Sequence, residues 1–182
     1  MSEKRKATSN PEPPNRPRRS AKKVNYAVDL PQLASVPGVK NFYISENLCQ
    51  RTFKEAGMEV VVTVGDSADL QYKLWKGRAD FRFPDGEIDS SAKATVEAAK
   101  QHCIAQLGEG KAVAVHCAAG VNRSSLVAVL VMQQLNPAWT PQEAIGKLTQ
   151  AKLSVNPTCH TLTNPHFVQH ILEGTSGPTS GT

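Results

Sequence analysis

A cysteine and an arginine separated by five residues stand out in this 182-residue sequence, because such a pair can perform phosphate chemistry. The stretch from His116 to Ser124 reads His-Cys-Ala-Ala-Gly-Val-Asn-Arg-Ser. A short loop between a strand and a helix can turn its backbone N–H groups inward, which binds a phosphate-sized anion and stabilises a thiolate at its centre. The planar guanidinium of Arg123 can hold two phosphate oxygens. We therefore interpret Cys117 as a nucleophile and not as a buried structural cysteine.

The other residues of this stretch have expected roles in the same chemistry. Gly120 permits a backbone angle or a close approach that a side chain would block. Ser124 can donate a hydrogen bond to the sulfur and help it leave, and His116 is expected to orient the loop through hydrogen bonds. The phosphate would meet the backbone of residues Ala118, Ala119, Gly120, Val121, Asn122 and Arg123.

The pattern His-Cys-x-x-Gly-x-x-Arg-Ser resembles the signature of the cysteine-dependent protein phosphatases, and the compact size resembles the dual-specificity branch. The loop is especially similar to that of the poxviral members. The resemblance extends from Val39 to Leu172, and it implies a protein-tyrosine-phosphatase-like fold. The chain departs from the branch at Lys152, where an arginine is common, and in a longer connection over residues 155–167.

Strand and helix patterns alternate along the chain, which predicts an α/β fold with a central, mostly parallel sheet flanked by helices. Ligands of such sheets bind at the carboxyl ends of the strands, where the Cys117 loop is expected. A capping box at Thr140 and Glu143 predicts one helix start, and Cys103 falls on the apolar face of another helix. The predicted strands are residues 39–44, 59–64, 79–84 and 112–115, and the predicted helices are residues 45–56, 90–108, 125–135, 141–151 and 165–172.

Three aspartates compete for the role of general acid. Asp80 precedes an apolar pair and is expected at the start of its strand, away from the carboxyl end. Asp89 directly precedes Ser90 and Ser91, one of which should cap the next helix, so its charge is explained as favouring the helix N-terminus. Asp85 follows the strand in a Pro-Asp-Gly turn that can extend over the loop. Its place 32 residues before the cysteine resembles the dual-specificity spacing, so we predict Asp85 as the acid.

The net charge of +5 is concentrated at the N-terminus. Residues 1–23 contain eight Lys and Arg against two Glu, a net +6, so the remaining residues sum to −1. This distribution disfavours a nucleic-acid-binding face on the folded part. We expect residues 1–25 to form a disordered basic tail, residues 26–173 the catalytic domain and residues 174–182 a flexible tail. The basic tail could be a nuclear import signal, could hold an acidic partner, or could be a solvated tail with no specific role.

Cysteine spacing and hydropathy indicate the compartment. The cysteines at positions 49, 103, 117 and 159 form no Cys-x-x-Cys pair and no zinc-ligand spacing, and the N-terminus lacks the apolar stretch of a signal peptide. The longest apolar run, residues 126–132, is too short to span a bilayer. We expect a cytoplasmic or nuclear protein that acts without a metal or other cofactor, and no membrane partner.

Three classes of function follow from these residues and from the resemblance. The favoured class hydrolyses phosphotyrosine and phosphoserine/threonine of proteins through a phosphocysteine intermediate. A second class acts on RNA 5′ ends or phosphoinositides; such enzymes tend to carry Lys or His inside the loop, whereas the variable positions here are neutral, although Asn122 before the arginine also occurs in RNA-directed relatives. The third class is a phosphopeptide-binding module, against which the intact Cys117 argues, because binding alone needs no nucleophile.

Overall fold

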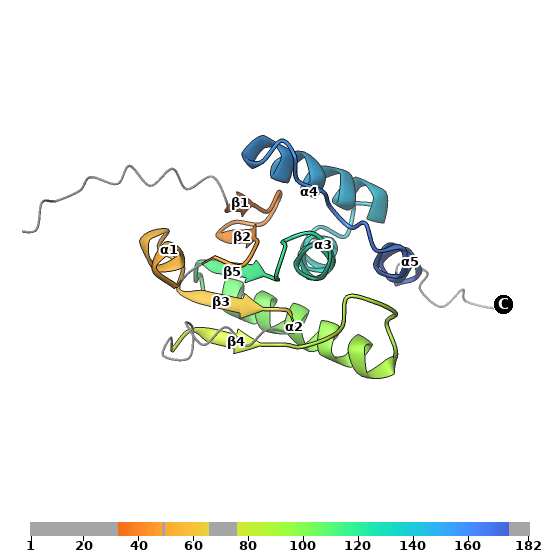
Figure 1. The fold of residues 1–182 in the computed structure, drawn as a ribbon, viewed down its shortest axis with the longest axis horizontal. Coiled ribbons are helices and arrows are strands. Elements are labelled where there is room, and N and C mark those ends of the chain that lie inside the picture. Colours follow the sequence, from red (N-terminus) through yellow and green to blue (C-terminus); the bar gives the residue numbers. More distant parts are fainter. Residues whose placement is uncertain (1–32, 49, 66–75, 175–182) are drawn as a thin grey trace, which may run out of the picture.

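The structure of the chain is a computed structural model that describes residues 33–48, 50–65 and 76–174. The predicted basic tail and the segment 175–182 lie outside the described residues. Within them, five strands form one sheet in the order β1-β2-β5-β3-β4 (Figure 1). The strands are β1 (Ala34–Ser35), β2 (Phe42–Ser45), β3 (Val60–Thr63), β4 (Arg78–Asp80) and β5 (Val113–His116), and the helices are α1 (Gln50–Glu55), α2 (Ser90–Gly108), α3 (Arg123–Leu135), α4 (Pro141–Val155) and α5 (Pro165–Glu173).

The sheet is mostly parallel, as the alternating pattern predicts. Strands β2, β5, β3 and β4 pair in parallel, and only the short β1, which the sequence analysis did not predict, pairs antiparallel with β2. The central strands β3 and β5 are buried at every position, which is typical of parallel strands covered on both faces. Because β5 lies between β2 and β3, the loop that follows it emerges in the middle of the carboxyl edge of the sheet.

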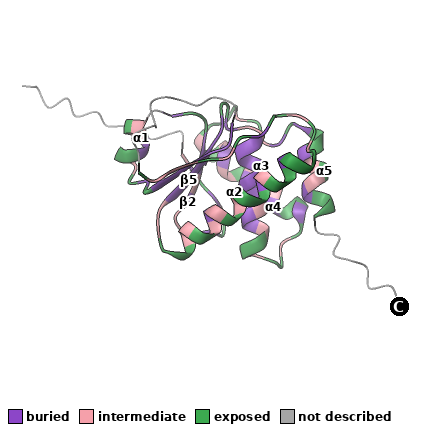
Figure 2. Ribbon diagram, turned by 90° about the horizontal axis from the view of Figure 1, so that it is seen from below, coloured by how far each residue is buried: buried purple, intermediate pink, exposed green. Residues whose placement is uncertain are grey.

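Side chains alternate between two apolar layers along the central strands. Val61 and Ala114 join the smaller layer with Phe53 of α1. Val62 and Val115 face the main core, which residues of α2, α3, α4 and α5 complete. Helix α3 is the most enclosed of these helices, and Figure 2 shows it mostly in purple, whereas α2 and α4 carry green exposed faces. None of the helices in the described part of the chain is long and apolar enough to cross a bilayer.

Several predicted element boundaries are wrong. The first strand, predicted over residues 39–44, begins at Phe42, and the helix predicted from Ser125 begins at Arg123. Two further errors lie at the carboxyl edge of the sheet. Ser45 does not cap a helix: it ends β2, because it pairs in parallel register with His116, and α1 begins only at Gln50. The strand predicted over residues 79–84 ends at Asp80, so this aspartate lies at the carboxyl end of β4 and not at its start. The apolar Phe83 beyond it packs against Phe167 of α5 and not within the sheet.

Two helix starts illustrate what local sequence can specify. The capping box is present as predicted: the Thr140 hydroxyl accepts from the Glu143 N–H, and the Glu143 carboxylate accepts from the Thr140 N–H. Helix α2, in contrast, is capped by Asp89 and not by Ser90 or Ser91, because the Asp89 carboxylate accepts the Ala92 N–H at 2.7 Å.

Candidate active site

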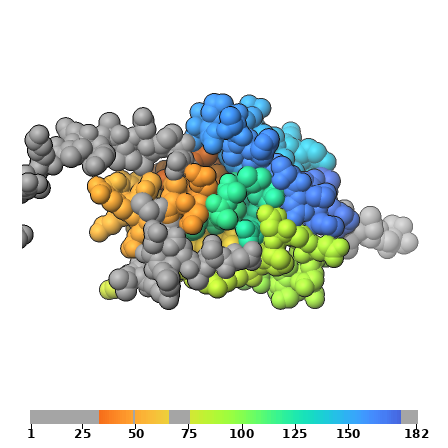
Figure 3. Space-filling model, in the orientation of Figure 1, coloured from red at the N-terminus to blue at the C-terminus, as the bar shows by residue number. Residues whose placement is uncertain are grey.

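The segment that joins β5 to α3, residues 117–122, is called the cysteine loop here. It begins directly after His116, the last residue of β5, and Asn122 is the N-cap of α3. In Figure 3 the green region, which contains this loop, reaches the surface between the lime region after β4 and the blue region after α4. The strand–loop–helix order directs the positive end of the α3 dipole at the loop.

Cys117 lies at the base of the loop, 3% exposed. Its Sγ atom is 3.2 Å from the Oγ atom of Ser124, a fully buried residue in the first turn of α3. A hydroxyl at this distance can donate a hydrogen bond to a thiolate and stabilise it when it forms or leaves. The arrangement fits the predicted roles of both residues, which remain predictions.

Three carbonyl groups of the loop are held from outside by other segments. The Ala118 carbonyl accepts the Asn47 N–H at 3.3 Å, and the Val121 carbonyl accepts the Leu162 N–H at 3.0 Å. The Gly120 carbonyl accepts Lys152 Nζ at 2.6 Å. In a trans peptide the N–H points opposite to the preceding carbonyl, so these contacts turn the N–H groups of the next residues away from the surrounding chain. N–H groups turned in this way can donate to a bound anion.

Gly120 has no tolerable replacement in this backbone. Its φ of +65° lies in the left-handed region, and a Cβ atom there would be 2.8 Å from the Glu46 nitrogen and 3.0 Å from the Ser45 carbonyl carbon. The end of β2 therefore passes directly against the loop. This contact explains why glycine is needed three residues after Cys117.

His116 supports the loop from the sheet. It is 2% exposed, its Nε2 atom lies 2.9 Å from the Thr63 hydroxyl of β3, and its ring packs against Phe53 with centroids 5.3 Å apart. Gly65 lies two residues after Thr63, the last residue of β3. A Cβ atom added at Gly65 would lie 3.9 Å from an Arg123 Nη atom. Such a Cβ would make only ordinary van der Waals contact, so the space at position 65 does not itself require glycine.

Lys152 is a functional candidate that the sequence analysis noted only as a departure from the dual-specificity pattern. This lysine of α4 is 5% exposed, and its ammonium donates to the Gly120 carbonyl, the Ser125 hydroxyl and the His160 carbonyl at 2.6, 3.2 and 2.8 Å. Burial lowers the pKa of Lys152, and the nearby thiols of Cys159 and Cys117 act in the opposite direction. All three ammonium donors are therefore used to hold the loop and its neighbours.

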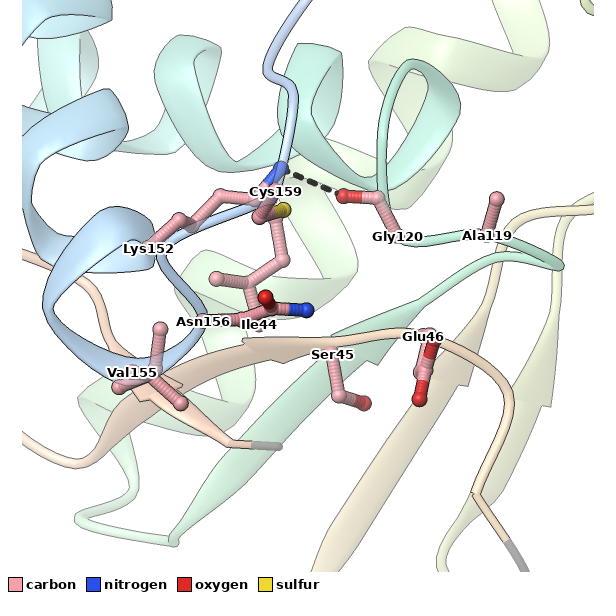
Figure 4. A pocket seen from close by; sticks show the side chains of 10 residues that line it. Ile44, Ser45, Glu46, Ala119, Gly120, Lys152, Val155, Asn156 and Cys159 are labelled. Carbon is pink, nitrogen blue, oxygen red and sulfur yellow. Dashed lines mark hydrogen bonds between the residues drawn. The ribbon is translucent and has the colours of Figure 1, made fainter. Parts of the chain in front are cut away.

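Figure 4 shows the Lys152 side chain extending from α4 to Gly120, with Cys159 beside it. These residues line a small cavity together with Ile44 and Ala119, and Cys117 is not among the residues that line it. The cavity therefore lies beside the residues that hold the loop and is not the expected phosphate position.

The three competing aspartates lie in different surroundings. Asp80 is at the carboxyl end of its strand, but its carboxylate binds Arg78 Nε at 2.7 Å. Asp89 accepts a helix N–H, as described above. Asp85 is the aspartate whose carboxylate contacts the cysteine loop: its Oδ2 atom accepts from Asn122 Nδ2 at 3.2 Å, and its Oδ1 atom accepts from Asn164 Nδ2 at 3.1 Å. The contact is compatible with Asp85 as the acid, which stays a prediction, whereas the strand position used against Asp80 was wrong.

The described residues contain no group of three His, Cys, Asp or Glu side chains placed to hold a metal ion. Cys103 is fully buried in α2, as its helical spacing predicts, and burial raises the pKa of its thiol to about 12. Cys49 lies outside the described residues.

Comparisons with known proteins agree with the fold. No protein-family model matches the sequence, and no curated protein matches it significantly. Among solved structures, Tk-PTP in its active form is 20% identical, with a TM-score of 0.63 over 80% of this chain and 96% of that chain. A kinase associated phosphatase with its catalytic site cysteine changed to serine is 14% identical, with a TM-score of 0.60 over 83% and 96%.

A third solved structure, the human tyrosine phosphatase-like serine/threonine/tyrosine-interacting protein, is 12% identical, with a TM-score of 0.64 over 78% of this chain and 94% of that chain. Together these structures show that the chain has the fold of the cysteine-based protein phosphatases. The similarity to the poxviral members stays a prediction.

Proposed function

Starting from the fold that this chain shares with cysteine-based protein phosphatases, we propose that it hydrolyses phosphate monoesters on phosphotyrosine and phosphoserine/threonine of proteins. The observation that carries the proposal is the cysteine loop itself. The buried Cys117 sulfur lies 3.2 Å from the Ser124 hydroxyl, and three carbonyls of the loop accept hydrogen bonds from neighbouring segments. This arrangement offers a nucleophile and an anion site at one point of the sheet edge.

In the first step the Cys117 thiolate attacks phosphorus in line with the departing oxygen. The S–P bond forms as the P–O bond to the substrate breaks, and Asp85 gives its proton to the departing alkoxide or phenoxide. The Arg123 guanidinium and the loop N–H groups neutralise the three remaining phosphoryl oxygens, whose charge would otherwise repel the thiolate.

In the second step a water molecule attacks the phosphocysteine. Asp85, now ionised, takes the water proton, the S–P bond breaks, and inorganic phosphate is released. The Ser124 hydroxyl donates to the departing Cys117 sulfur and stabilises it as a thiolate. The cycle consumes one water and restores the starting protonation of both groups.

We favour phosphoprotein substrates over more highly charged substrates, because the variable positions of the cysteine loop carry no cationic side chain. The side chains at these positions are neutral. Among the described residues, Lys152 is the lysine with a hydrogen bond to the loop, and it donates to the Gly120 carbonyl. An RNA 5′-triphosphate or a phosphoinositide would present further phosphates with no matching cation inside the loop.

The test is an assay of purified protein on phosphotyrosine and phosphothreonine peptides, an RNA 5′-triphosphate and a phosphoinositide, each at the same concentration. We expect turnover of the peptides, none after Cys117→Ser, and retained phosphopeptide binding by that variant. EDTA should leave the rate unchanged. Faster turnover of the RNA or lipid would favour the second class of substrate, and peptide binding without any turnover by the wild type would favour a binding module.

A further inference from the structure

We propose that Asn122 and Asn164 form an amide fork that positions Asp85 over the cysteine loop. The inference rests on the proposed function, since Asp85 matters as an acid only if the loop performs phosphoryl transfer. It concerns two asparagines to which neither the sequence analysis nor the general chemistry of the loop gives a role in proton transfer. They are positioning residues, because they act through Asp85.

The orientation of the Asn122 amide is fixed by its own hydrogen bonds. Its Oδ1 atom accepts the backbone N–H of Thr163 at 2.8 Å and that of Asn164 at 3.1 Å, and the Thr163 hydroxyl at 3.1 Å. Backbone N–H groups can only donate, so the oxygen must face them and the NH₂ group must face the other way. The atom 3.2 Å from Asp85 Oδ2 is therefore the nitrogen, a donor.

The orientation of the Asn164 amide follows by the same reasoning. Asn164 is the N-cap of α5, and its Oδ1 atom accepts the His166 N–H at 3.0 Å. Its Nδ2 group is left to donate, and it does so to Asp85 Oδ1 at 3.1 Å and to the Gly86 carbonyl at 3.2 Å. Asn164 is only 9% exposed, so its side chain is held by packing as well as by the cap.

Each carboxylate oxygen of Asp85 thus receives one NH₂ group from a different segment of the chain. Asp85 itself lies in an exposed turn, where a free side chain would sample several rotamers. The fork limits it to one place, and that place is tied to the nucleophile, because Asn122 belongs to the cysteine loop.

The experiment uses variants that remove the NH₂ donors. Serine caps a helix about as well as asparagine, so Asn164→Ser keeps the α5 cap while its hydroxyl is too short to reach Asp85. Asn122→Ser removes the other NH₂ donor, but it also removes the oxygen that accepts the Thr163 and Asn164 N–H groups, so Asn164→Ser is the more selective test. Asn156→Ser is the matched control: Asn156 lies in the same connection after α4, accepts a backbone N–H in the same way, and has no hydrogen bond to Asp85.

Turnover is measured on two aryl phosphates, one with a poor leaving group, which needs the acid, and one with a good leaving group, which scarcely does. We expect Asn164→Ser and Asn122→Ser each to slow the poor substrate by about tenfold, less than the loss of about 10²–10⁴-fold expected for Asp85→Asn. The good substrate should change by less than about threefold, and the rate of Cys117 alkylation by iodoacetate should be unchanged, a pattern that a purely structural defect would not give.

Two results would overturn the inference alone: an equal fall on both substrates, or no fall on either, while Asp85→Asn still discriminates between them. If wild-type protein turns over neither substrate, the proposed function fails and the inference fails with it. Asn156→Ser should match the wild type, and a substrate-dependent loss in this control would also count against the fork.

Discussion

Replacing the buried Lys152 with methionine should destabilise the conformation of the cysteine loop. Methionine fills a similar volume without a charge, so the change removes the three hydrogen bonds of the ammonium and also the cost of burying it. The carbonyls of Gly120 and His160 then keep only weaker donors, the Ser125 hydroxyl at 3.4 Å and the Cys159 thiol at 3.2 Å. A poorly satisfied buried acceptor costs about 1–3 kcal/mol, so two would lower the free energy of unfolding by at most about 2–6 kcal/mol. The part-buried position of the His160 carbonyl and the removed cost of burying the ammonium reduce this, and we expect a loss of about 2–4 kcal/mol.

The same substitution should reduce catalysis by more than the stability loss requires. Without Lys152, the peptide between Gly120 and Val121 can rotate, which turns a carbonyl toward the phosphate in place of an N–H group. Loss of one such preorganised donor typically lowers kcat by about 10²–10³-fold. We expect a fall of at least about tenfold on a phosphotyrosine peptide at a temperature where the variant is fully folded.

The assay pairs urea unfolding with steady-state turnover, and Lys147→Met is the control on the same helix. Lys147 is exposed and lies 4.8 Å over the Trp139 ring, a contact worth about 0.5–1 kcal/mol, and it has no contact with the loop. At a urea slope of about 1–3 kcal/mol/M, Lys152→Met should lower the midpoint by about 1 M or more. If Lys152→Met keeps both the wild-type midpoint and the wild-type kcat, the assigned role of the lysine is wrong.

Four further predictions use the same protein. Gly120→Ala should abolish turnover and lower the free energy of unfolding by about 1–3 kcal/mol, because alanine disfavours the positive φ and its Cβ would contact the end of β2. Circular dichroism and urea unfolding measure the stability, and a variant with wild-type activity would contradict the prediction. Asp85→Asn should slow the steady-state turnover of a poor-leaving-group substrate by about 10²–10⁴-fold, and a rate equal to that of the wild type would contradict the assignment. The pKa of Cys103 is raised from 9.0 to about 12 in the folded state, so between these values only the unfolded state loses the thiol proton. The free energy of unfolding should therefore fall as pH rises through this range. Measured by urea unfolding at pH 8 and 10.5, this fall should be smaller in Cys103→Val than in the wild type. Removing residues 1–25 should leave turnover of a small aryl phosphate nearly unchanged, and a large loss of thermal stability would show that this segment packs.

The sequence by itself determined the parts of this protein that depend on neighbouring residues. The valine-rich strands, the loop between Cys117 and Arg123 and the capping box at Thr140 are local patterns, and alternating strands and helices have few ways to pack, so the mostly parallel sheet followed. The loop could be singled out because its chemistry requires residue types at fixed spacing. The same reasoning could not place Asp80, because where β4 ends depends on its pairing with β3.

Only the tertiary structure decided which distant side chains reach the loop. Lys152 is 32 residues from the carbonyl that it holds, and Asn164 is 79 residues from Asp85. Asparagine and lysine are common in surface segments, so nothing in their local sequence separates a buried positioning residue from a solvated one. Their roles arise when α4 and α5 pack against α3, which brings the connection between them to the same edge of the sheet as the end of β5. That packing is a property of the whole core, and no single segment encodes it.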